Sequence, residues 1–506
     1  MLRRARITRI ALILLAFVLT SLPLLASSPR LSIILPRGAQ RGKEHVFTFS
    51  GSNLGDAKEI FFYSPGFKVT KLEPKGNIVK ATIQIAPDCR LGEHVAQVRT
   101  ASGISDYRTF FVGALQDVAE KEPNSDFLKP QKIALNSTVS GVVQSEDVDY
   151  YEIEAKKGQR ISAEVEGMRL GTFLFDPYVA ILDSKRFELS SGDDTPLVIQ
   201  DSVASAVAPA DGKYIIEVRE SAYGGNGNCR YRLHVGTYPR PTAVYPAGGK
   251  MGSEVDVKFL GDPTGTLSQR VKLPTEQTPD FGVFAQDAGG IAPSPNAFRL
   301  FEHGNAFEAE PNDSMKTASV VALPNAFNGI ISKKGDVDYF RFTAKKGQAF
   351  EVECYARRVR SALDPVMHIY YGNGRYITSN DDSRGPDSYF RFQAPADGEH
   401  ILRVTDHLGR GGPDFVYRVE LQAVKPSLSL NIPRVERYGQ YRQTIYVPRG
   451  GRFATLITAN RRNFGGELVL EGKGLPAGIK IHADPMASNL NVMPVVFEAA
   501  PDAPLA

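Results

Sequence analysis

The chain repeats itself internally, and this repeat limits the folds open to it more than any other feature. Glu-Pro-Asn at residues 122–124 recurs at 310–312, and Asp-Val-Asp-Tyr at 147–150 recurs at 336–339. Further pieces recur in the same order: Lys-Lys-Gly-Gln (156–159, 345–348), Asp-Pro (176–177, 364–365), Asp-Asp (193–194, 381–382), Ala-Pro-Ala-Asp-Gly (208–212, 394–398) and Tyr-Arg (231–232, 417–418). The offset drifts only from 189 to 186 residues, so one larger unit occurs twice.

A second, weaker repeat precedes each larger unit. Pro-Arg-Gly at 36–38 and Phe-Ser-Gly at 49–51 align with Pro-Ala-Gly at 246–248 and Phe-Leu-Gly at 259–261. The 506 residues therefore divide into two pairs of a small and a larger unit, with a fifth segment after them. The predicted units are 29–113, 114–236 (copy one), 237–303, 304–422 (copy two) and 423–506.

Every unit has the pattern of β-strands. Apolar residues alternate with polar ones at 161–166 and at 350–354, which predicts strands with one buried and one solvent-facing side. The residues expected to face solvent in copy one are Ser162, Glu164 and Glu166. Glycine-containing turns such as Asp-Gly at 211–212 and 397–398 separate the strands. The predicted fold class is all-β, with tandem β-sandwich domains of immunoglobulin-like and jelly-roll-like kinds.

The N-terminus has the pattern of a secretory signal peptide. Four arginines within the first nine residues precede an apolar run at 10–19, and small residues come after it at 26–28. This predicts a signal peptide at 1–28, with a retained signal anchor as the alternative. Its removal leaves 56 basic and 56 acidic residues, a balance that argues against nucleic-acid binding. No later segment is apolar enough to span a membrane, so we expect a secreted, periplasmic or cell-surface protein.

The three cysteines, Cys89, Cys229 and Cys354, fall in three different predicted units. Export implies an oxidising compartment, yet a disulfide within one unit would have no partner. We therefore predict that they are buried, small apolar residues, with one intermolecular bridge as the alternative.

The larger unit resembles the bacterial pre-peptidase C-terminal (PPC) domain. The resemblance rests on the Glu-Pro-Asn opening, the Asp-Val-Asp-Tyr strand start, the Lys-Lys-Gly-Gln turn, the Asp-Pro, the Asp-Asp pair and the Ala-Pro-Ala-Asp-Gly turn. It covers residues 114–236 and 304–422, nearly half of the chain, and implies two jelly-roll-like β-sandwiches. PPC domains occur beside secreted peptidases and in large surface proteins. Relatives in bacterial collagenases bind calcium, and some bind collagen.

The smaller unit resembles immunoglobulin-like IPT/TIG domains. Residues 29–113 carry the resemblance at 36–38, at 47–55 and at 86–92, whereas 237–303 matches as a degenerate copy. Residues 423–506 are predicted to be an Ig-like β domain that is incomplete, because the Pro-Asp-Ala-Pro-Leu turn at 501–505 has no closing strand after it. The order of units is similar to that of large exported proteins of planctomycete-type bacteria.

Copy two opens with an acidic segment, Glu-Ala-Glu-Pro-Asn-Asp at 308–313. Alternate residues of an extended chain point the same way, so the first, third and fifth side chains are expected to converge. Two aspartates of the next turn add carboxylates. The segment is similar to the Glu-x-Glu-x-Asn-Asp calcium-binding linker of the collagenase relatives. The predicted ligands are Glu308, Glu310, Asn312, Asp313, Asp336 and Asp338.

Copy one offers a less complete set, because Ser125 replaces the last aspartate and Asp126 comes next. The predicted ligands there are Glu120, Glu122, Asn124, Asp147 and Asp149. Calcium, the expected ion, prefers such hard oxygen donors. The alternative is that these acids cap turns and solvate a domain boundary. The Asp-Asp pairs at 193–194 and 381–382 are expected to be exposed turn residues.

The sequence carries no recognisable catalytic motif. Its eight histidines form no His-Glu-x-x-His pattern, and no Gly-x-Ser-x-Gly elbow occurs. We therefore predict a protein that is not an enzyme and name no catalytic residues, with an enzyme in its own right as the least favoured alternative, because catalytic residues can be dispersed along a chain. A basic cluster in the last segment is predicted to be a solvated sheet face, with an anionic glycan or envelope polymer as the alternative partner. It consists of Arg434, Arg437, Arg442, Arg449, Arg452, Arg461 and Arg462.

These observations predict an exported, non-catalytic multidomain protein for binding or adhesion at the cell surface or outside the cell. Its expected partner is an extracellular or cell-envelope polymer or protein. The alternative is the accessory region of a secreted peptidase or other hydrolase whose catalytic domain is absent from this chain. Because fold does not determine function, experiment has to separate the two.

Overall fold

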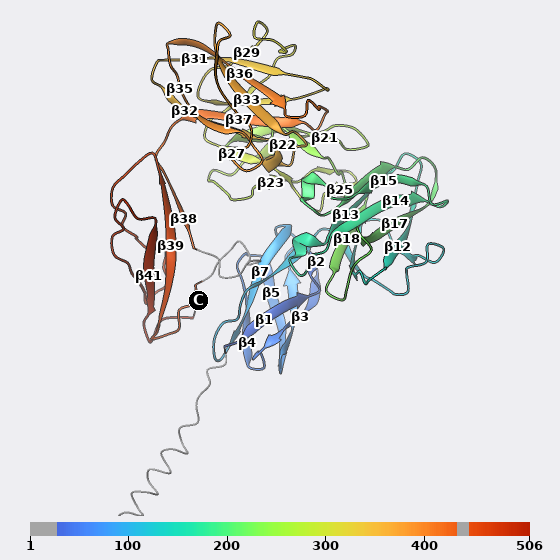
Figure 1. The fold of residues 1–506 in the computed structure, drawn as a ribbon. Coiled ribbons are helices and arrows are strands. Elements are labelled where there is room, and N and C mark those ends of the chain that lie inside the picture. The colour runs from blue at the N-terminus through green and yellow to red at the C-terminus, as the bar shows by residue number, and fades with distance from the viewer. Residues whose placement is uncertain (1–27, 433–444, 506) are drawn as a thin grey trace, which may run out of the picture. The chain divides into compact units, whose positions relative to one another are not determined.

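The computed structural model describes residues 28–432 and 445–505. The predicted signal peptide therefore lies almost wholly outside the described residues, as do Arg434, Arg437 and Arg442. The fold is built from β-strands, which confirms the all-β prediction (Figure 1). The described helical turns are three single 3₁₀ turns, η1 (Met168–Leu170), η2 (Pro196–Val198) and η3 (Arg357–Val359). Within the described ranges, no helix has the length and apolarity to cross a membrane.

The chain divides into two compact bodies. The first, up to residue 37 and then 41–111, carries two antiparallel sheets; residues 38–40 (β2) and everything from 112 onward belong to the second. One sheet of the first body has the order β1 (Arg30–Leu35), β3 (Glu44–Ser52), β6 (Ile78–Ile85), β5 (Phe67–Lys75). The other places β8 (Arg108–Gly113), β7 (Gly92–Thr100) and β4 (Ala57–Phe62) side by side.

Copy one is a sandwich of two five-stranded sheets. The first has the order β10 (Gln131–Lys132), β12 (Val148–Ala155), β17 (Gly212–Glu220), β14 (Pro177–Asp183), β15 (Glu188–Gly192). The second has the order β16 (Val203–Val207), β13 (Arg160–Glu166), β18 (Arg230–Gly236), β11 (Ser137–Val142), β9 (Gln116–Ala119). Alternate residues of these strands point inward and form one apolar core that includes Tyr151, Cys229 and Tyr231.

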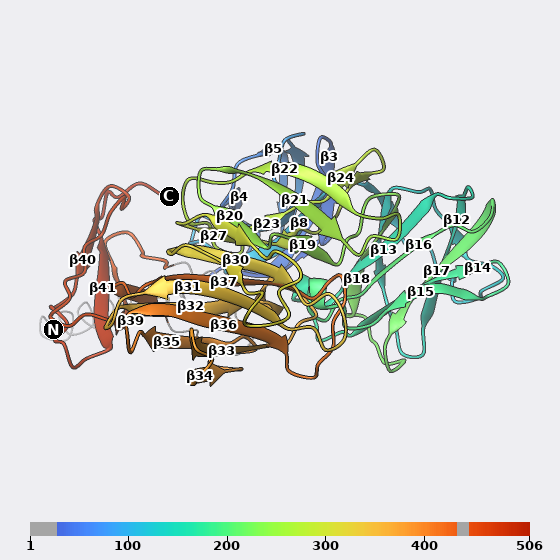
Figure 2. The same cartoon turned by 90° about the horizontal axis from the view of Figure 1, so that it is seen from above.

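Copy two has the same strand order, strand for strand. Most of its strands are labelled in Figure 2. One sheet runs β29 (Ser319–Val320), β31 (Asp338–Ala344), β36 (Gly398–Asp406), β33 (Pro365–Tyr371), β34 (Tyr376–Asn380). The other runs β35 (Tyr389–Gln393), β32 (Ala349–Tyr355), β37 (Val416–Ala423), β30 (Asn325–Ile330), β28 (Asn305–Phe307). Cys354 lies in the core of this sandwich.

The remaining two units are smaller. Residues 237–303 form one sheet, β19 (Ala243–Tyr245), β21 (Glu254–Leu260), β22 (Leu267–Lys272), and three short pairs. The pairs are β20 (Gly248–Lys250) with β27 (Arg299–Phe301), β23 (Gly282–Val283) with β26 (Asn296–Ala297), and β24 (Gln286–Asp287) with β25 (Gly290–Ile291). The last unit is one sheet, β38 (Ser427–Asn431), β39 (Arg452–Arg462), β41 (Val492–Ala499), β40 (Ile479–His482).

Two sequence expectations have clear outcomes. All three cysteines are unpaired and buried, as expected of small core residues. The prediction that Ser162, Glu164 and Glu166 face solvent is wrong, because every residue of β13 is buried. The polar side of this strand is covered by residues 237–303, which supply charged and polar partners to it. The corresponding strand of copy two, β32, keeps the predicted alternation over most of its length.

Candidate metal centre

Copy two gathers three carboxylates where its linker meets the sandwich. Glu308 and Glu310 lie just after β28, and Asp338 is the first residue of β31. One carboxylate oxygen from each lies within 4.8 Å of the others. Asp338 is buried, Glu308 is half-buried and Glu310 is exposed, so the cluster opens toward solvent on the linker side. The extended backbone of the linker explains the pattern, because residues two apart project to the same side.

Asn312 completes the cluster of copy two. Its side-chain amide ends 3.1 Å from a carboxylate oxygen of Glu310 and 3.1 Å from one of Asp338. Turned with its nitrogen inward, the amide donates to both carboxylates; turned with its oxygen inward, it adds a fourth oxygen donor. The backbone holds the residue in place, because its N–H donates to Glu310 at 2.8 Å and its C=O accepts from the Tyr339 N–H at 3.2 Å.

A glycine makes room for the first carboxylate. The Ile330 N–H donates to Glu308 Oε1 at 3.0 Å, which draws the Glu308 side chain across the backbone of β30. A Cβ at Gly329 would overlap both the Glu308 carboxylate and the Tyr417 hydroxyl. Gly141 has the same relation to Glu120 and Tyr231 in copy one. Both copies therefore keep a glycine where a side chain would fill the space taken by the carboxylate.

Burial and mutual repulsion make these carboxylates hard to ionise. Burial, together with the nearby negative charge of Asp338, raises the pKa of Glu308 to about 9. Burial raises the pKa of Asp338 to about 7, and the charge of Asp336 adds to this although the Tyr417 hydroxyl, which donates to Asp338 at 2.6 Å, opposes it. The charges that act most strongly on both groups are other carboxylates, so the described residues supply the cluster with no compensating cation of the protein's own.

Copy one builds an equivalent cluster from Glu120, Glu122 and Asp149, again with oxygens within 4.8 Å of one another. The Asn124 N–H donates to Glu122 at 2.8 Å, and its C=O accepts from the Tyr150 N–H at 3.1 Å. The Asn124 side-chain oxygen is buried and has no hydrogen-bond partner.

Tyrosine hydroxyls distinguish copy one. The Tyr231 hydroxyl donates to Asp149 at 2.7 Å and lies 2.8 Å from Glu120. The Tyr151 hydroxyl also lies 2.8 Å from Glu120. Tyr151 and Tyr231 also share a short hydrogen bond. In copy two, Tyr417 corresponds to Tyr231, whereas Phe340 stands where copy one has Tyr151. Burial, together with the charge of Glu120, raises the pKa of Asp149 to about 9.

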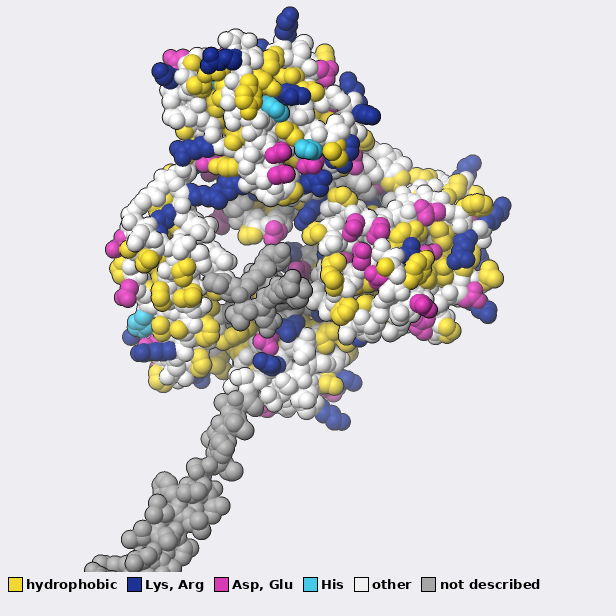
Figure 3. Space-filling view, viewed as in Figure 1, with side chains coloured by type: hydrophobic (Ala, Val, Ile, Leu, Met, Phe, Trp, Pro, Cys, Tyr) yellow, Lys and Arg dark blue, Asp and Glu magenta, His cyan; other side chains and the backbone are white. Residues whose placement is uncertain are grey.

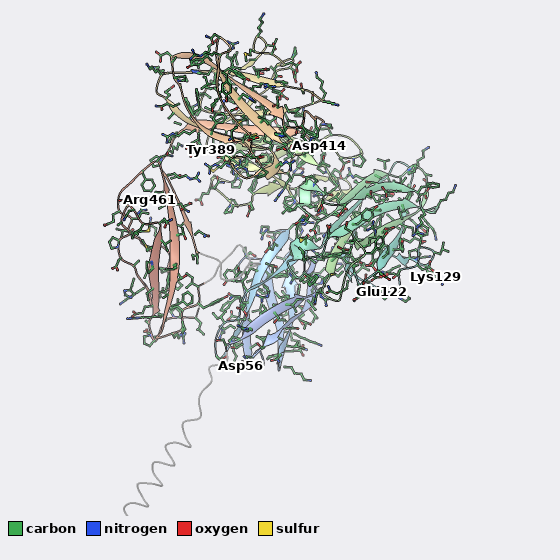
Figure 4. The ribbon with its side chains drawn as sticks, viewed as in Figure 1. Asp56, Glu122, Lys129, Tyr389, Asp414 and Arg461 are labelled. Atoms are coloured by element: carbon green, nitrogen blue, oxygen red, sulfur yellow. The ribbon has the colours of Figure 1, made fainter. Side chains whose placement is uncertain are left out.

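The other predicted ligands lie beside the clusters and do not join the groups of three. Asp336 accepts from the backbone N–H and the hydroxyl of Ser332 at 2.6 and 2.7 Å, and Asp313 interacts with it. In copy one Asp147 accepts from the Ser125 hydroxyl at 2.8 Å. The serine that replaces the last aspartate of the motif thus forms a hydrogen bond to the equivalent carboxylate. Figure 4 labels Glu122 on copy one.

Sequence reasoning missed the tyrosines and the glycines of these clusters. Tyr231 and Tyr417 belong to the repeated Tyr-Arg pair, so the repeat itself was a usable signal. Gly141 and Gly329 are also separated by 188 residues, the offset of the Glu-Pro-Asn motif. Neither type of residue is a usual calcium ligand, and for that reason a search for ligand types passes over them.

The donor set fits a hard divalent cation. Each cluster offers three carboxylates, the Asn312 amide adds to the cluster of copy two, and neither group contains a sulfur or imidazole donor. Ca²⁺ takes six to eight oxygen ligands, often completed by water and backbone carbonyls. The exposed glutamate of each cluster leaves room for such water. The clusters are therefore chemically suited to Ca²⁺, and Asp149, Asp338 and the two glutamates of each copy are the residues that would hold it.

Comparison with known proteins gives a family for part of copy two. A probable subtilase-type serine protease of Deinococcus radiodurans is 34% identical over 99 residues, which are 19% of this chain and 14% of that protein. Among solved structures, the pre-peptidase C-terminal domain of a collagenase from Bacillus anthracis matches with 14% identity and a TM-score of 0.18, over 21% of this chain and 94% of that one. A periplasmic inhibitor of g-type lysozyme from Salmonella Typhimurium matches with 23% identity and a TM-score of 0.17, over 21% and 100%.

The family model covers the segment that begins at the acidic turn of copy two. It spans residues 336–406, from Asp336 to the last residue of β36. The segment includes Asp338, the buried carboxylate of the cluster. The match is to the bacterial pre-peptidase C-terminal domain, and the chain therefore contains a domain of this family.

Proposed function

We propose that this chain is an exported, non-catalytic protein whose two larger units are calcium-stabilised PPC domains that support binding at the cell surface or outside the cell. One observation carries the proposal: the same cluster is built twice at equivalent positions, from Glu120, Glu122 and Asp149 and from Glu308, Glu310 and Asp338. Carboxylates that lie this close repel one another and destabilise each copy. A bound divalent cation would offset this repulsion in both copies.

Calcium would act on the connection between units. Glu308 and Glu310 belong to the segment that enters copy two, whereas Asp338 belongs to the central strand β31 of its sandwich. An ion held by all three ties the linker to the fold, so it reduces the freedom of the joint as well as stabilising the domain. Outside the cell, where calcium-binding modules work at higher calcium concentrations, such joints would stay rigid.

A second candidate function is the accessory region of a secreted peptidase. It is favoured by the 34% identity to the Deinococcus protein, which is described as a probable subtilase-type serine protease. The chain covers 14% of that protein, so the likeness concerns a part of it. In this alternative the sandwiches would assist folding, export or substrate capture for a catalytic domain supplied elsewhere.

Calcium titration of the full chain tests the first proposal. Calorimetry is expected to detect two sites, and the melting temperature is expected to rise as calcium is added to protein stripped with a chelator. At about 100 times the Kd, one site contributes roughly 2.7 kcal/mol. Glu310→Gln and Glu122→Gln should each remove one site and leave the other. No heat and no shift in melting temperature at millimolar calcium would overturn the proposal.

Binding and activity assays separate the two functions. The exported protein would be mixed with collagen, cell-wall polymers and glycans in the presence of calcium or a chelator, and retention on each polymer measured. Retention that depends on calcium favours the binding role. Retention of a peptidase, or faster cleavage by a peptidase mixed with the chain, favours the accessory role. Proteolysis by the chain alone, abolished by a single substitution, would contradict both.

A further inference from the structure

The polar side of β13 in copy one is a closed joint. Ser162 donates to the Tyr238 C=O at 2.9 Å, and Arg160 lies 3.1 Å from Asp262. Arg160 also donates to the Thr237 C=O at 3.0 Å. The partners belong to residues 237–303, so this unit sits directly on the sheet of copy one.

Charged groups seal the same joint. Glu164, which has no exposed surface, lies 2.7 Å from Arg240 and 3.0 Å from Arg169. Arg169 donates to Ser294 at 2.7 Å and pairs with the buried Asp201. Although burial raises the pKa of Glu164, the two guanidinium groups outweigh it and lower the pKa overall.

In copy two the same strand has a different neighbour, because Arg462 and Asn463 of the last unit lie near its polar side and leave a cavity there. Glu351 and Glu353 occupy the positions of Ser162 and Glu164, and Arg358 and Asp387 those of Arg169 and Asp201. Arg358 lies 2.8 Å from Glu353 and 2.7 Å from Asp387, so the inner part of the ion-pair network is kept. The place of the docked Arg240 is taken from within copy two by Arg384, whose Nε lies 3.8 Å from Glu353.

A cavity of about 620 Å³ lies over this face. Three arginines line it, Arg384, Arg391 and Arg462, together with one acid, Glu351. Two residues of the lining are joined by a hydrogen bond, which Arg391 donates to the side-chain oxygen of Asn463 at 3.0 Å. This volume falls within the range of about 300–1,000 Å³ that is usual for small-ligand sites.

The lining of the cavity carries more positive than negative charge, with three arginines and one glutamate. Glu351 accepts a short hydrogen bond from the Tyr389 hydroxyl, and Arg384 stacks on the Tyr389 ring with its Cζ 3.9 Å from the ring centre. Arg384 Nε is buried and has no hydrogen-bond partner. Figure 3 shows Lys and Arg side chains along the edge of copy two where Figure 4 labels Tyr389.

We propose that this cavity binds a carboxylate-bearing, hydroxyl-rich ligand, an oligosaccharide of sugar acids, at the place where copy one binds the next domain. Guanidinium forks match carboxylates in charge and shape. The hydroxyl and amide side chains of Ser383, Asn380 and Asn463 suit the hydroxyl groups of sugars. The inference deepens the proposed function, on which it rests, by assigning a class of polymer and a site to the binding role.

Calorimetry on the full chain tests this site. The probes are a galacturonic acid tetramer, a neutral galactose tetramer and hexaglutamate, each with calcium and with chelator. The acidic sugar is expected to bind more tightly than the other two. Arg391→Gln and Arg462→Gln should each weaken it roughly 10-fold, because each removes charge-assisted hydrogen bonds. Added salt should weaken it as well.

Arg375→Gln is the matched control. Arg375 is an exposed arginine of copy two that also stacks on a tyrosine, Tyr371, but it lies outside the cavity lining. Its substitution is expected to leave affinity and melting temperature unchanged. The proposal is overturned if the acidic sugar does not bind, if the neutral sugar or hexaglutamate binds as tightly, or if Arg375→Gln weakens binding equally. A separate titration measures the heat of calcium binding at the two carboxylate clusters. It shows whether the proposed calcium function holds when the proposed sugar site does not.

Discussion

Copy one and copy two have the same strand order and equivalent carboxylate clusters, yet they differ in what surrounds each feature. At the cluster, copy one has two tyrosine hydroxyls, from Tyr151 and Tyr231, where copy two has only Tyr417. Copy one also has Ser125 where copy two has Asp313. The two copies share the three carboxylates of the cluster, whereas the neighbouring side chains that form hydrogen bonds to these carboxylates differ.

The outer face of the second sheet shows the larger difference. In copy one Glu164 is closed in by Arg169 and Arg240, and the strand that carries it is buried throughout. In copy two Glu353 keeps a partner, Arg358, but stays partly exposed beside a cavity. The same inner network can therefore end in a closed domain joint or beside a cavity, depending on how closely the next unit of the chain packs on it.

The largest expected difference between the copies concerns this face. Glu164→Gln should cost about 3–5 kcal/mol of unfolding free energy, because it leaves the buried Arg240 without its carboxylate and Arg169 with Asp201 alone. Glu353→Gln should cost about 1 kcal/mol or less, because its pair is partly solvated. Urea unfolding monitored by circular dichroism measures both. Equal losses would show that the joint of copy one is not sealed by its charges.

The second largest effect on stability is expected when the glycine beside each cluster is replaced by alanine. Gly329→Ala and Gly141→Ala should each cost about 1–3 kcal/mol, since a Cβ would displace a carboxylate and a tyrosine hydroxyl. Each should also remove one calcium site and spare the site of the other copy. Gly304→Ala is the control, because a Cβ there would meet only an ordinary contact with Asn325. A full complement of calcium sites in both variants would argue against the clusters as metal centres.

The pH dependence of stability should show the raised pKa values of the carboxyls in both clusters. A carboxyl whose pKa is higher in the folded than in the unfolded chain binds a proton only in the folded state between the two values, so stability falls as pH rises through that interval. For Asp338 the interval ends at about 7, and for Glu308 and Asp149 at about 9.

Without calcium, the free energy of unfolding should therefore fall from pH 5 to pH 9, and the melting temperature should fall with it. Calcium should remove this fall, because it replaces the bound protons, and its affinity should rise with pH. The rise should extend to about pH 9 in both copies, because Glu308 and Asp149 both have a pKa raised to about 9. Thermal melts of Glu122→Gln and Glu310→Gln, each of which retains a single site, measure the two profiles separately. A stability that rises over this range without calcium would contradict the charge repulsion inferred for the clusters.

The smallest effect is expected from exchanging the residues at the end of the motif. Ser125→Asp should raise calcium affinity at copy one, and Asp313→Ser should lower it at copy two, each by about tenfold or less, since neither residue belongs to the group of three. Calorimetry on single-site variants resolves such shifts. Opposite signs for the two exchanges are the essential result, and shifts of the same sign would show that the residue acts through stability.

Much of the fold could be predicted from local pattern. The repeat predicted two equivalent units, and the period-two alternation predicted strands, because both depend on residues close together in the chain. The spacing of Glu308, Glu310 and Asn312 predicted the linker side of the copy-two cluster for the same reason. The choice of Asp338 over Asp336 as the third carboxylate could not be predicted, since it depends on where β31 begins beside the linker.

The sequence by itself determined the all-β class, the two copies of the motif and the oxygen chemistry of the candidate metal centre, since these depend on residue type and period. Only the tertiary structure decided which polar side chains face solvent. Glu164 and Glu353 stand at the same position of the same strand pattern, but one is covered by a unit more than seventy residues further along the chain. Alternation specifies which side of a sheet a residue is on, and long-range packing determines whether that side is covered.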